Sequence, residues 1–91
     1  MKLFMVTNGY QYGPYNIGCW VIAETAKRAV LMARLKFRQE ADRMNKCLEE
    51  ALTKPYYTPD FWERLEASIF MPDIPSHKEF ASDVDRQLWE I

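Results

Sequence analysis

The fold is decided by the stretch IGCWVIAETAKRAV at residues 17–30, which changes abruptly from a strand pattern to a helix pattern. Residues 17–23 are rich in the β-branched and aromatic side chains that suit a pleated sheet. Thr25 follows as an N-cap, because its hydroxyl can accept a hydrogen bond from an otherwise unpaired first-turn amide. We therefore expect a strand that leads directly into a helix beginning at Ala26.

A second strand precedes this stretch. Residues 3–7 form a short apolar run, and all three glycines and one proline fall between Asn8 and Gly18. We expect the two runs to pair as an antiparallel hairpin with a long Tyr-rich loop, which lets the more apolar runs face each other. A tight turn at Asn8-Gly9, pairing residues 3–7 with residues 10–12, is the alternative. Two strands alone leave exposed edges, so a further segment or a partner chain must cover them.

The run from Ala26 to about Leu52 contains no Gly or Pro, which predicts one long helix that ends before Pro55. Apolar residues recur along it in steps of three and four and predict the stripe that packs on the hairpin: Ala26, Val30, Ala33, Phe37, Ala41, Met44, Leu48 and Ala51. Leu31 and Leu35 lie nearly opposite this stripe. Either the C-terminal helices cover these two leucines, or they form a dimer or partner face.

Two shorter helices are expected after the long one. Residues 58–60 (Thr-Pro-Asp) give a start signal, with Phe61, Leu65, Ser68 and Ile69 on one face. Residues 76–79 (Ser-His-Lys-Glu) fit a capping box for a final helix. The predicted fold class is α+β, with the order β-β-α-α-α in a single domain over residues 1–91.

Composition places the chain among packed globular proteins. It has 91 residues, of which 48% are hydrophobic and 14% aromatic, too rich for disorder. The two cysteines, Cys19 and Cys47, are expected to be buried free thiols. The longest uncharged run, residues 3–23, is broken by Gly, Pro and Asn and cannot form a membrane helix. With no signal peptide either, we expect a soluble protein of the cytoplasm that has no membrane partner.

Charges are separated along the chain. In residues 27–46 seven bases stand against two acids: Lys27, Arg28, Arg34, Lys36, Arg38, Arg43 and Lys46 against Glu40 and Asp42. In residues 57–91 the balance is reversed, with three bases against eight acids: Arg64, Lys78 and Arg86 against Asp60, Glu63, Glu66, Asp73, Glu79, Asp83, Asp85 and Glu90. The formal net charge of −1 therefore hides a polarised molecule.

The separation of charge along the chain has three possible interpretations. Lys27, Arg34 and Arg38 share one line on the long helix, and a basic helical face is typical of phosphate binding. The acids of the same chain, for example Glu63 and Glu66, could instead neutralise these bases, or an acidic protein partner could bind them. The net charge and a sequence pI of about 5.8 argue against a dedicated nucleic-acid binder.

Tyrosines gather near two predicted loops. Tyr10, Tyr12 and Tyr15 flank the hairpin loop, and Tyr56 and Tyr57 precede the second helix. Tyr supplies a large contact area at low entropic cost, which suits recognition of a protein surface. We therefore expect all five tyrosines, together with Arg34 and Arg38, to contact a partner. A local aromatic cluster that braces the two loops is the alternative.

Catalysis has little support in the sequence. His77 is the only histidine, and no nucleophile, base and orienting residue recur at a recognisable spacing. There is no Gly-rich phosphate loop, and one His with two distant Cys gives no zinc pattern. We expect no enzymatic activity, no metal and no cofactor.

The opening residues 1–7, followed after the Gly/Tyr loop by residues 20–29 (WVIAETAKRA), resemble many small proteins of bacteriophages and mobile elements, some of them anti-CRISPR inhibitors. The similarity covers about the first 35 residues. It implies an inhibitor of a bacterial defence complex that docks onto a larger nucleic-acid-handling protein or ribonucleoprotein in the host cytoplasm. A small nucleic-acid-binding regulator and a homodimeric phage accessory protein are the alternatives.

Overall fold

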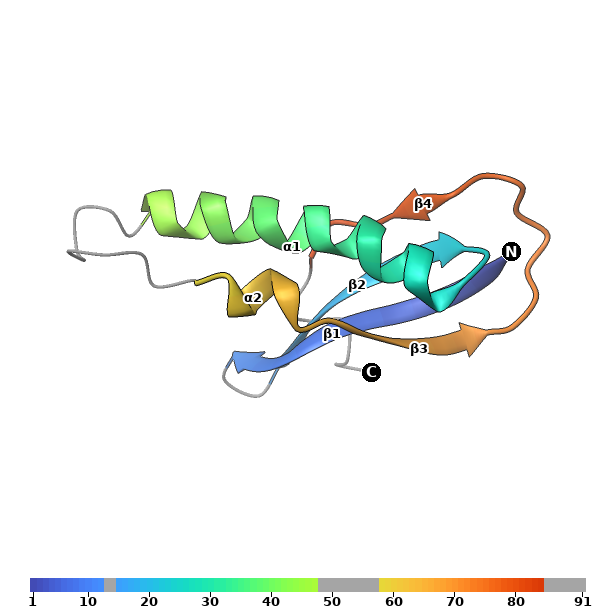
Figure 1. Cartoon of the computed structure of the whole chain (residues 1–91), viewed down its shortest axis with the longest axis horizontal. Helices are drawn as coiled ribbons and strands as arrows, with labels where there is room; N and C mark the ends of the chain where they lie inside the picture. Colours follow the sequence, from blue (N-terminus) through green and yellow to red (C-terminus); the bar gives the residue numbers. More distant parts are fainter. Residues whose placement is uncertain (13–14, 48–57, 85–91) are drawn as a thin grey trace.

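In a computed structural model, which describes residues 1–12, 15–47 and 58–84, a long helix crosses one face of an antiparallel sheet (Figure 1). The sheet has four strands in the order β3-β1-β2-β4. The elements are β1 (Lys2–Tyr12), β2 (Tyr15–Ala23), α1 (Ala26–Cys47), α2 (Asp60–Glu63), β3 (Glu66–Met71) and β4 (Phe80–Ala81). The expected α+β class, the N-terminal antiparallel strand pair and the long helix are confirmed.

The hairpin is longer than the two apolar runs that predicted it. β1 and β2 pair from Lys2↔Ala23 to Tyr12↔Tyr15, with a shift of register between Thr7 and Gln11. Gly9 lies inside this shift at φ +78°, a conformation that glycine adopts without a steric penalty. The Asn8-Gly9 pair therefore forms an irregularity within β1 and not the tight turn of the alternative prediction.

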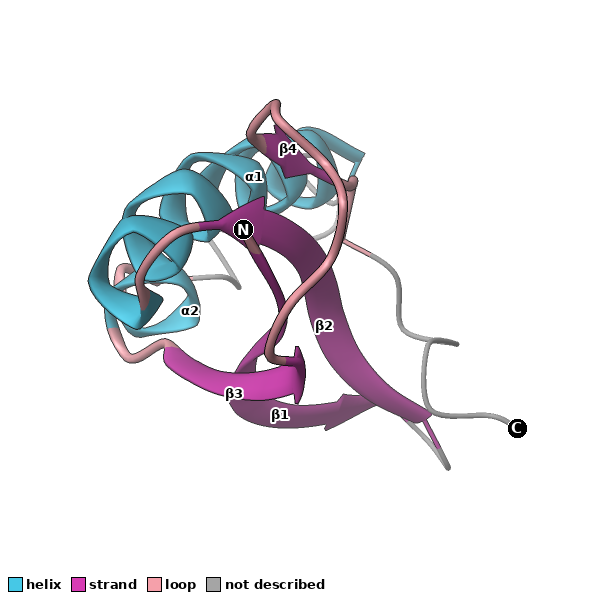
Figure 2. Ribbon diagram, turned by 90° about the vertical axis from the view of Figure 1, so that its right-hand side faces the viewer, coloured by secondary structure: helices cyan, strands magenta, loops and turns pink. Residues whose placement is uncertain are grey.

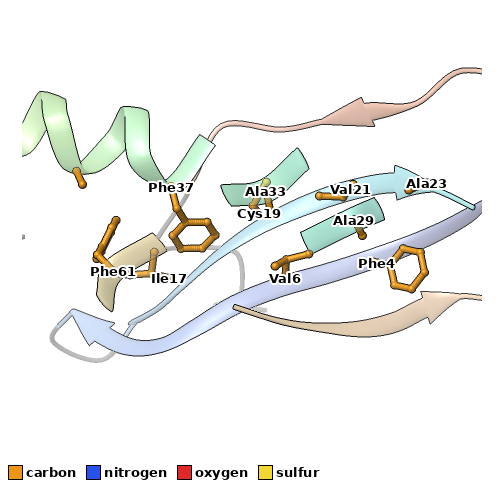
Figure 3. Packing of buried hydrophobic residues seen from close by; sticks show 11 residues of the cluster. Phe4, Val6, Ile17, Cys19, Val21, Ala23, Ala29, Ala33, Phe37 and Phe61 are labelled. Carbon is orange, nitrogen blue, oxygen red and sulfur yellow. The ribbon is translucent and has the colours of Figure 1, made fainter. Parts of the chain in front are cut away.

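The core forms where α1 packs on the hairpin. Ala33, Phe37 and Ala41 of the predicted stripe are buried, but its start is wrong, because Ala26 is exposed and the buried residue of the first turn is Ala29. Thr25 caps the helix, since its Oγ1 accepts a hydrogen bond from the Arg28 amide at 3.1 Å. Ala29, Ala33, Phe37 and Ala41 point inward and are fully buried. They meet inward-facing residues of the two long strands, chiefly Phe4, Val6, Ile17, Cys19 and Val21 (Figure 3). Figure 2 shows the sheet curving around this side of α1.

The prediction of a second helix is wrong beyond the first helical turn. α2 ends at Glu63, and Arg64 adopts φ −104° and ψ 61°, outside the helical region. Residues 66–71 then form β3, which pairs antiparallel with β1 from Thr7↔Glu66 to Leu3↔Met71. The hairpin otherwise leaves the backbone of β1 unpaired on this side, and the run Ser-Ile-Phe-Met at 68–71 suits a strand better than a helix.

The third predicted helix is not formed in the described residues up to 84. Ser76 Oγ accepts a hydrogen bond from the Lys78 amide at 3.4 Å and makes no capping box. Phe80 and Ala81 form β4 on the other edge of the hairpin, opposite Ile22 and Val21. The structure thus has two helices in its described part, and residues 48–52 and 85–91 of the predicted helices lie outside it. No helix within the described ranges is long and apolar enough to cross a membrane.

Candidate partner-binding groove

An open groove of about 560 Å³ lies along α1 on the side that faces α2. Its lining combines apolar and charged side chains: Leu31, Arg34, Leu35, Arg38, Trp62 and Glu63. Four of these residues were predicted from the sequence as a partner face. The structure therefore brings the two predicted arginines and the two predicted leucines to one place.

Helical spacing explains why the four α1 residues lie together. Leu31 and Leu35 are one turn apart, as are Arg34 and Arg38, so each pair stacks along the helix axis. The leucines lie on the side of α1 that faces away from the buried alanines, and they are 47% and 60% exposed. The alternative prediction, that C-terminal helices cover these two leucines, is wrong for the described chain, because its C-terminal segments form β3 and β4 in the sheet.

Two contacts fix α2 against the rest of the fold. The rings of Phe37 and Phe61 meet edge to face, with centroids 5.6 Å apart, and Phe61 is almost completely buried. The buried side chain of Asn8 donates from Nδ2 to the Phe61 carbonyl oxygen at 2.7 Å. Because Phe61 points inward (Figure 3), its neighbour Trp62 is held at the surface of the groove.

Trp62 and Arg38 contact each other in the lining of the groove. The Arg38 guanidinium carbon lies 5.6 Å from the centroid of the Trp62 ring, within the range of a cation–π interaction. This contact holds the charge of an exposed arginine beside a half-buried aromatic surface. A residue that carries both an apolar body and a carboxylate would find complementary chemistry here.

The acidic residues of the chain neutralise one flank of α1. The Arg28 guanidinium donates to both carboxylate oxygens of Glu79, at 2.8 and 3.0 Å, and Lys36 Nζ donates to Asp83 at 3.3 Å. The bond to Arg28 lowers the pKa of the Glu79 carboxyl, and Glu79 in turn raises the pKa of Arg28. Both acids belong to the segment around β4, so this neutralisation is confined to the β4 side of the helix.

The opposite flank keeps its positive charge. Within the described part of the chain, Lys27, Arg34 and Arg38 make no ion pair with any acid. The acids that were candidates to neutralise them lie elsewhere or make other contacts: Asp60 pairs with Arg64 at 3.5 Å, and Glu66 stands on β3. Glu63 lines the groove without an ion pair in that part of the structure.

The structure does not test the prediction that the five tyrosines contact a partner. Tyr10 and Tyr12 belong to β1 and Tyr15 belongs to β2, at the hairpin end where the structure describes only the backbone. Tyr56 and Tyr57 lie outside the described residues. Trp62 is not among the residues that the sequence predicts as partner contacts. The signal that could have identified it is its position directly after Phe61, because side chains of adjacent helical residues point about 100° apart.

The described chain has no cluster of metal-binding side chains. It contains no group of three His, Cys, Asp or Glu side chains that could hold a metal ion. His77 is exposed in the connection between β3 and β4. Cys19 is a buried free thiol that donates from Sγ to the Ser82 carbonyl oxygen at 3.0 Å, and burial raises its pKa. A thiol held protonated in the core is a poor nucleophile.

No family model matches this chain, and neither a curated protein nor a solved structure does so.

Proposed function

We propose that this protein is a non-enzymatic interaction module that binds an acidic, amphipathic segment of a larger protein in the groove between α1 and α2. The main support is that one side of α1 carries two exposed leucines, Leu31 and Leu35, beside three bases that have no acidic partner in the described chain. The bases are Lys27, Arg34 and Arg38. An apolar face alone would suit many partners. The adjacent uncompensated charge selects one that carries carboxylates.

The groove chemistry favours a protein over a nucleic acid. Each neutralised phosphate contributes through counterion release, so tight nucleic-acid binding needs several bases in reach of the backbone. Only Lys27, Arg34 and Arg38 line up on this flank, whereas Leu31 and Leu35 gain nothing from a phosphate chain. Aromatic and arginine side chains such as Trp62 and Arg38 are typical anchors of protein interfaces.

The larger partner, on this proposal, is a nucleic-acid-handling protein of a bacterial defence system, and the chain acts in the host cytoplasm as a stoichiometric inhibitor. Two observations support this part of the proposal. The first 35 residues resemble small phage-encoded proteins of which some are anti-CRISPR inhibitors. The groove presents the mixture of positive charge and apolar surface that suits occlusion of an acidic protein surface.

Affinity capture with groove variants tests the proposal. We expect the tagged protein to retain a defence nuclease or a subunit of such a complex from a bacterial lysate. Retention should fall about tenfold or more with Leu35→Glu and with Arg38→Glu, because hot-spot residues contribute roughly 2 kcal/mol or more. Lys46→Glu is the matched control, since it reverses an exposed base of α1 that does not line the groove.

Two results would contradict the proposal. Capture that is unchanged by both groove variants would place the interface elsewhere on the molecule. The second result is direct binding of the purified protein to duplex or single-stranded nucleic acid, with an affinity that falls steeply with salt and is lost with Arg34→Glu. It would favour the alternative function, a small nucleic-acid-binding regulator.

A further inference from the structure

One edge of the sheet is apolar and pairs regularly with β1 over residues 66–69, before a shift of register at Phe70. β3 is the outermost strand next to β1, and no described element lies beyond it (Figure 1). Its six residues, Glu66–Met71, include no Lys, Pro or Gly, the residues that commonly stop an edge strand from pairing. The opposite edge differs, because β4 is only two residues long and is followed by the charged Asp83. The two edges are therefore not equivalent.

The side chains of β3 leave much apolar surface in contact with water. Ile69 is 56% exposed, Phe70 57% and Met71 45%, although all three lie in a paired strand. The Phe70 ring also contacts the Trp20 ring of β2 edge to face, with centroids 4.9 Å apart. Met5, on the strand between them, is only 3% exposed. The Trp20 and Phe70 rings thus carry apolar surface from the hairpin to β3.

We propose that β3 pairs antiparallel with β3 of a second copy of this chain, centred on Ser68, and so joins two four-stranded sheets into one. A two-fold axis through such a pair makes both partners use the same residues. Ala67 of each copy then lies opposite Ile69 of the other. The main-chain groups on the outer side of each β3 gain partners, which is the usual source of affinity in strand addition.

The sequence of β3 favours a second copy as the occupant of this edge. Each strand carries one carboxylate, Glu66, and antiparallel pairing about Ser68 puts the two carboxylates at opposite ends of the seam. Like charges directly opposite each other, which destabilise strand pairs, are therefore avoided. Small residues also oppose large ones, since Ala67 meets Ile69 in both halves.

The area buried between the two β3 strands determines the expected affinity of the dimer. A stable interface buries roughly 800 Å² on each partner, and one six-residue strand provides less than this. We therefore expect a reversible dimer that forms in the micromolar range. The groove proposal does not depend on it, because no groove residue belongs to β3. Failure of either proposal leaves the other intact.

Sedimentation velocity over a hundredfold range of concentration tests the pairing. We expect the mass to rise from that of one chain to that of two, and Ile69→Lys to raise the dissociation constant about tenfold or more. Phe80→Lys is the matched control, because Phe80 is 55% exposed on the opposite edge of the sheet. Leu35→Lys is a second control, since it disrupts a dimer formed through the outer side of α1.

A cross-linking experiment checks the register. In a Cys47→Ser background, Ser68→Cys should be joined to its counterpart by a short bis-maleimide, because directly opposite Cβ atoms lie about 5 Å apart. Glu66→Cys should react far less, since the two residues would be separated by about 13 Å along the strands. Efficient joining at 66 and not at 68 would overturn the proposed register.

Three outcomes overturn the pairing itself. A chain that remains monomeric at high micromolar concentration would leave the edge free for an extended segment of another protein. A dimer that survives Ile69→Lys would form through a different surface. A dimer that is lost with Leu35→Lys, but not with Ile69→Lys, would place the contact on α1.

Discussion

Phe37 and Phe61 connect α1 to α2 within the core, and each is fully or almost fully buried. We expect Phe37→Ala to lower the free energy of unfolding by about 3–5 kcal/mol, because it removes a buried ring and leaves a cavity beside Phe61. Urea denaturation followed by circular dichroism measures this loss. Since small domains are stabilised by roughly 5–15 kcal/mol in total, the variant should be close to its folding limit.

Leu35→Ala is the matched control for the Phe37 prediction. Leu35 lies on the same helix but is 60% exposed, so its truncation should change the free energy of unfolding by about 0.5 kcal/mol or less. Phe37→Leu provides a milder second variant, which should fold and show an intermediate loss. Equal losses for Phe37→Ala and Leu35→Ala would contradict the arrangement of the core.

Among single residues, the sequence predicts those whose place depends on local spacing. Ala33, Phe37 and Ala41 follow this rule, because helical periodicity alone determines their direction, whereas the exposed Ala26 at the start of the predicted stripe does not. Arg34, Arg38, Leu31 and Leu35 share a side of α1 for the same reason. Trp62 was not assigned, because its role depends on a contact with Arg38, which lies 24 positions earlier in the chain.

At the scale of elements, Asn8 links the irregular part of β1 to α2 through its 2.7 Å hydrogen bond to the Phe61 carbonyl oxygen. We expect Asn8→Ala to cost about 1–3 kcal/mol, since it removes a donor from a buried acceptor. Thermal or urea unfolding gives the total change. Amide hydrogen exchange should show greater loss of protection in α2 than in the middle of α1, because α2 loses a direct contact.

Gly9→Ala helps to interpret that result. The added Cβ would meet no atom within 4 Å, so any loss comes from the positive φ and not from a clash. That backbone penalty should be about 1–2 kcal/mol and should not be concentrated in α2. If both variants loosen α2 to the same extent, the Asn8 side chain has no special part in holding it.

The two misassigned elements, β3 and β4, share a physical cause. Local signals at residues 58–60 and 76–79 are genuine start patterns for helices, but only a single turn forms after the first. Both segments reach an edge of the hairpin, where unpaired backbone groups offer hydrogen bonds that an isolated short helix cannot match. The position of those edges is a property of the assembled hairpin. The run at residues 68–71 suits a strand, but it does not reveal which edge the strand joins.

At the scale of the whole molecule, the ion pair between Arg28 and Glu79 joins the start of α1 to the long connection between β3 and β4. The hydrogen bonds from Arg28 lower the pKa of Glu79 in the folded state. Its contribution to stability is therefore present above the ordinary pKa of a glutamate and is lost as the pH falls through the lowered value. Both side chains are partly exposed, so this contribution is small.

Carbon-13 NMR titration of the Glu79 carboxyl measures the effect directly. We expect a pKa below that of an unperturbed glutamate, about 4.3, and a return toward that value in Arg28→Gln. Arg43→Gln is the matched control, because Arg43 pairs with Glu40 on the same helix and not with Glu79. An unchanged Glu79 pKa in Arg28→Gln would show that the connection does not rest on α1 in solution.

The crossing from β3 to β4 has a consequence for how the protein is made. Residues 66–81 supply both outer strands, one on each side of a hairpin that was completed by residue 23. While the ribosome is still adding the last quarter of the sequence, the outer sides of β1 and β2 in the nascent chain both have unpaired backbone groups. Arrival of residues 66–81 shields both together, so a stalled or clipped translation product should be prone to aggregate.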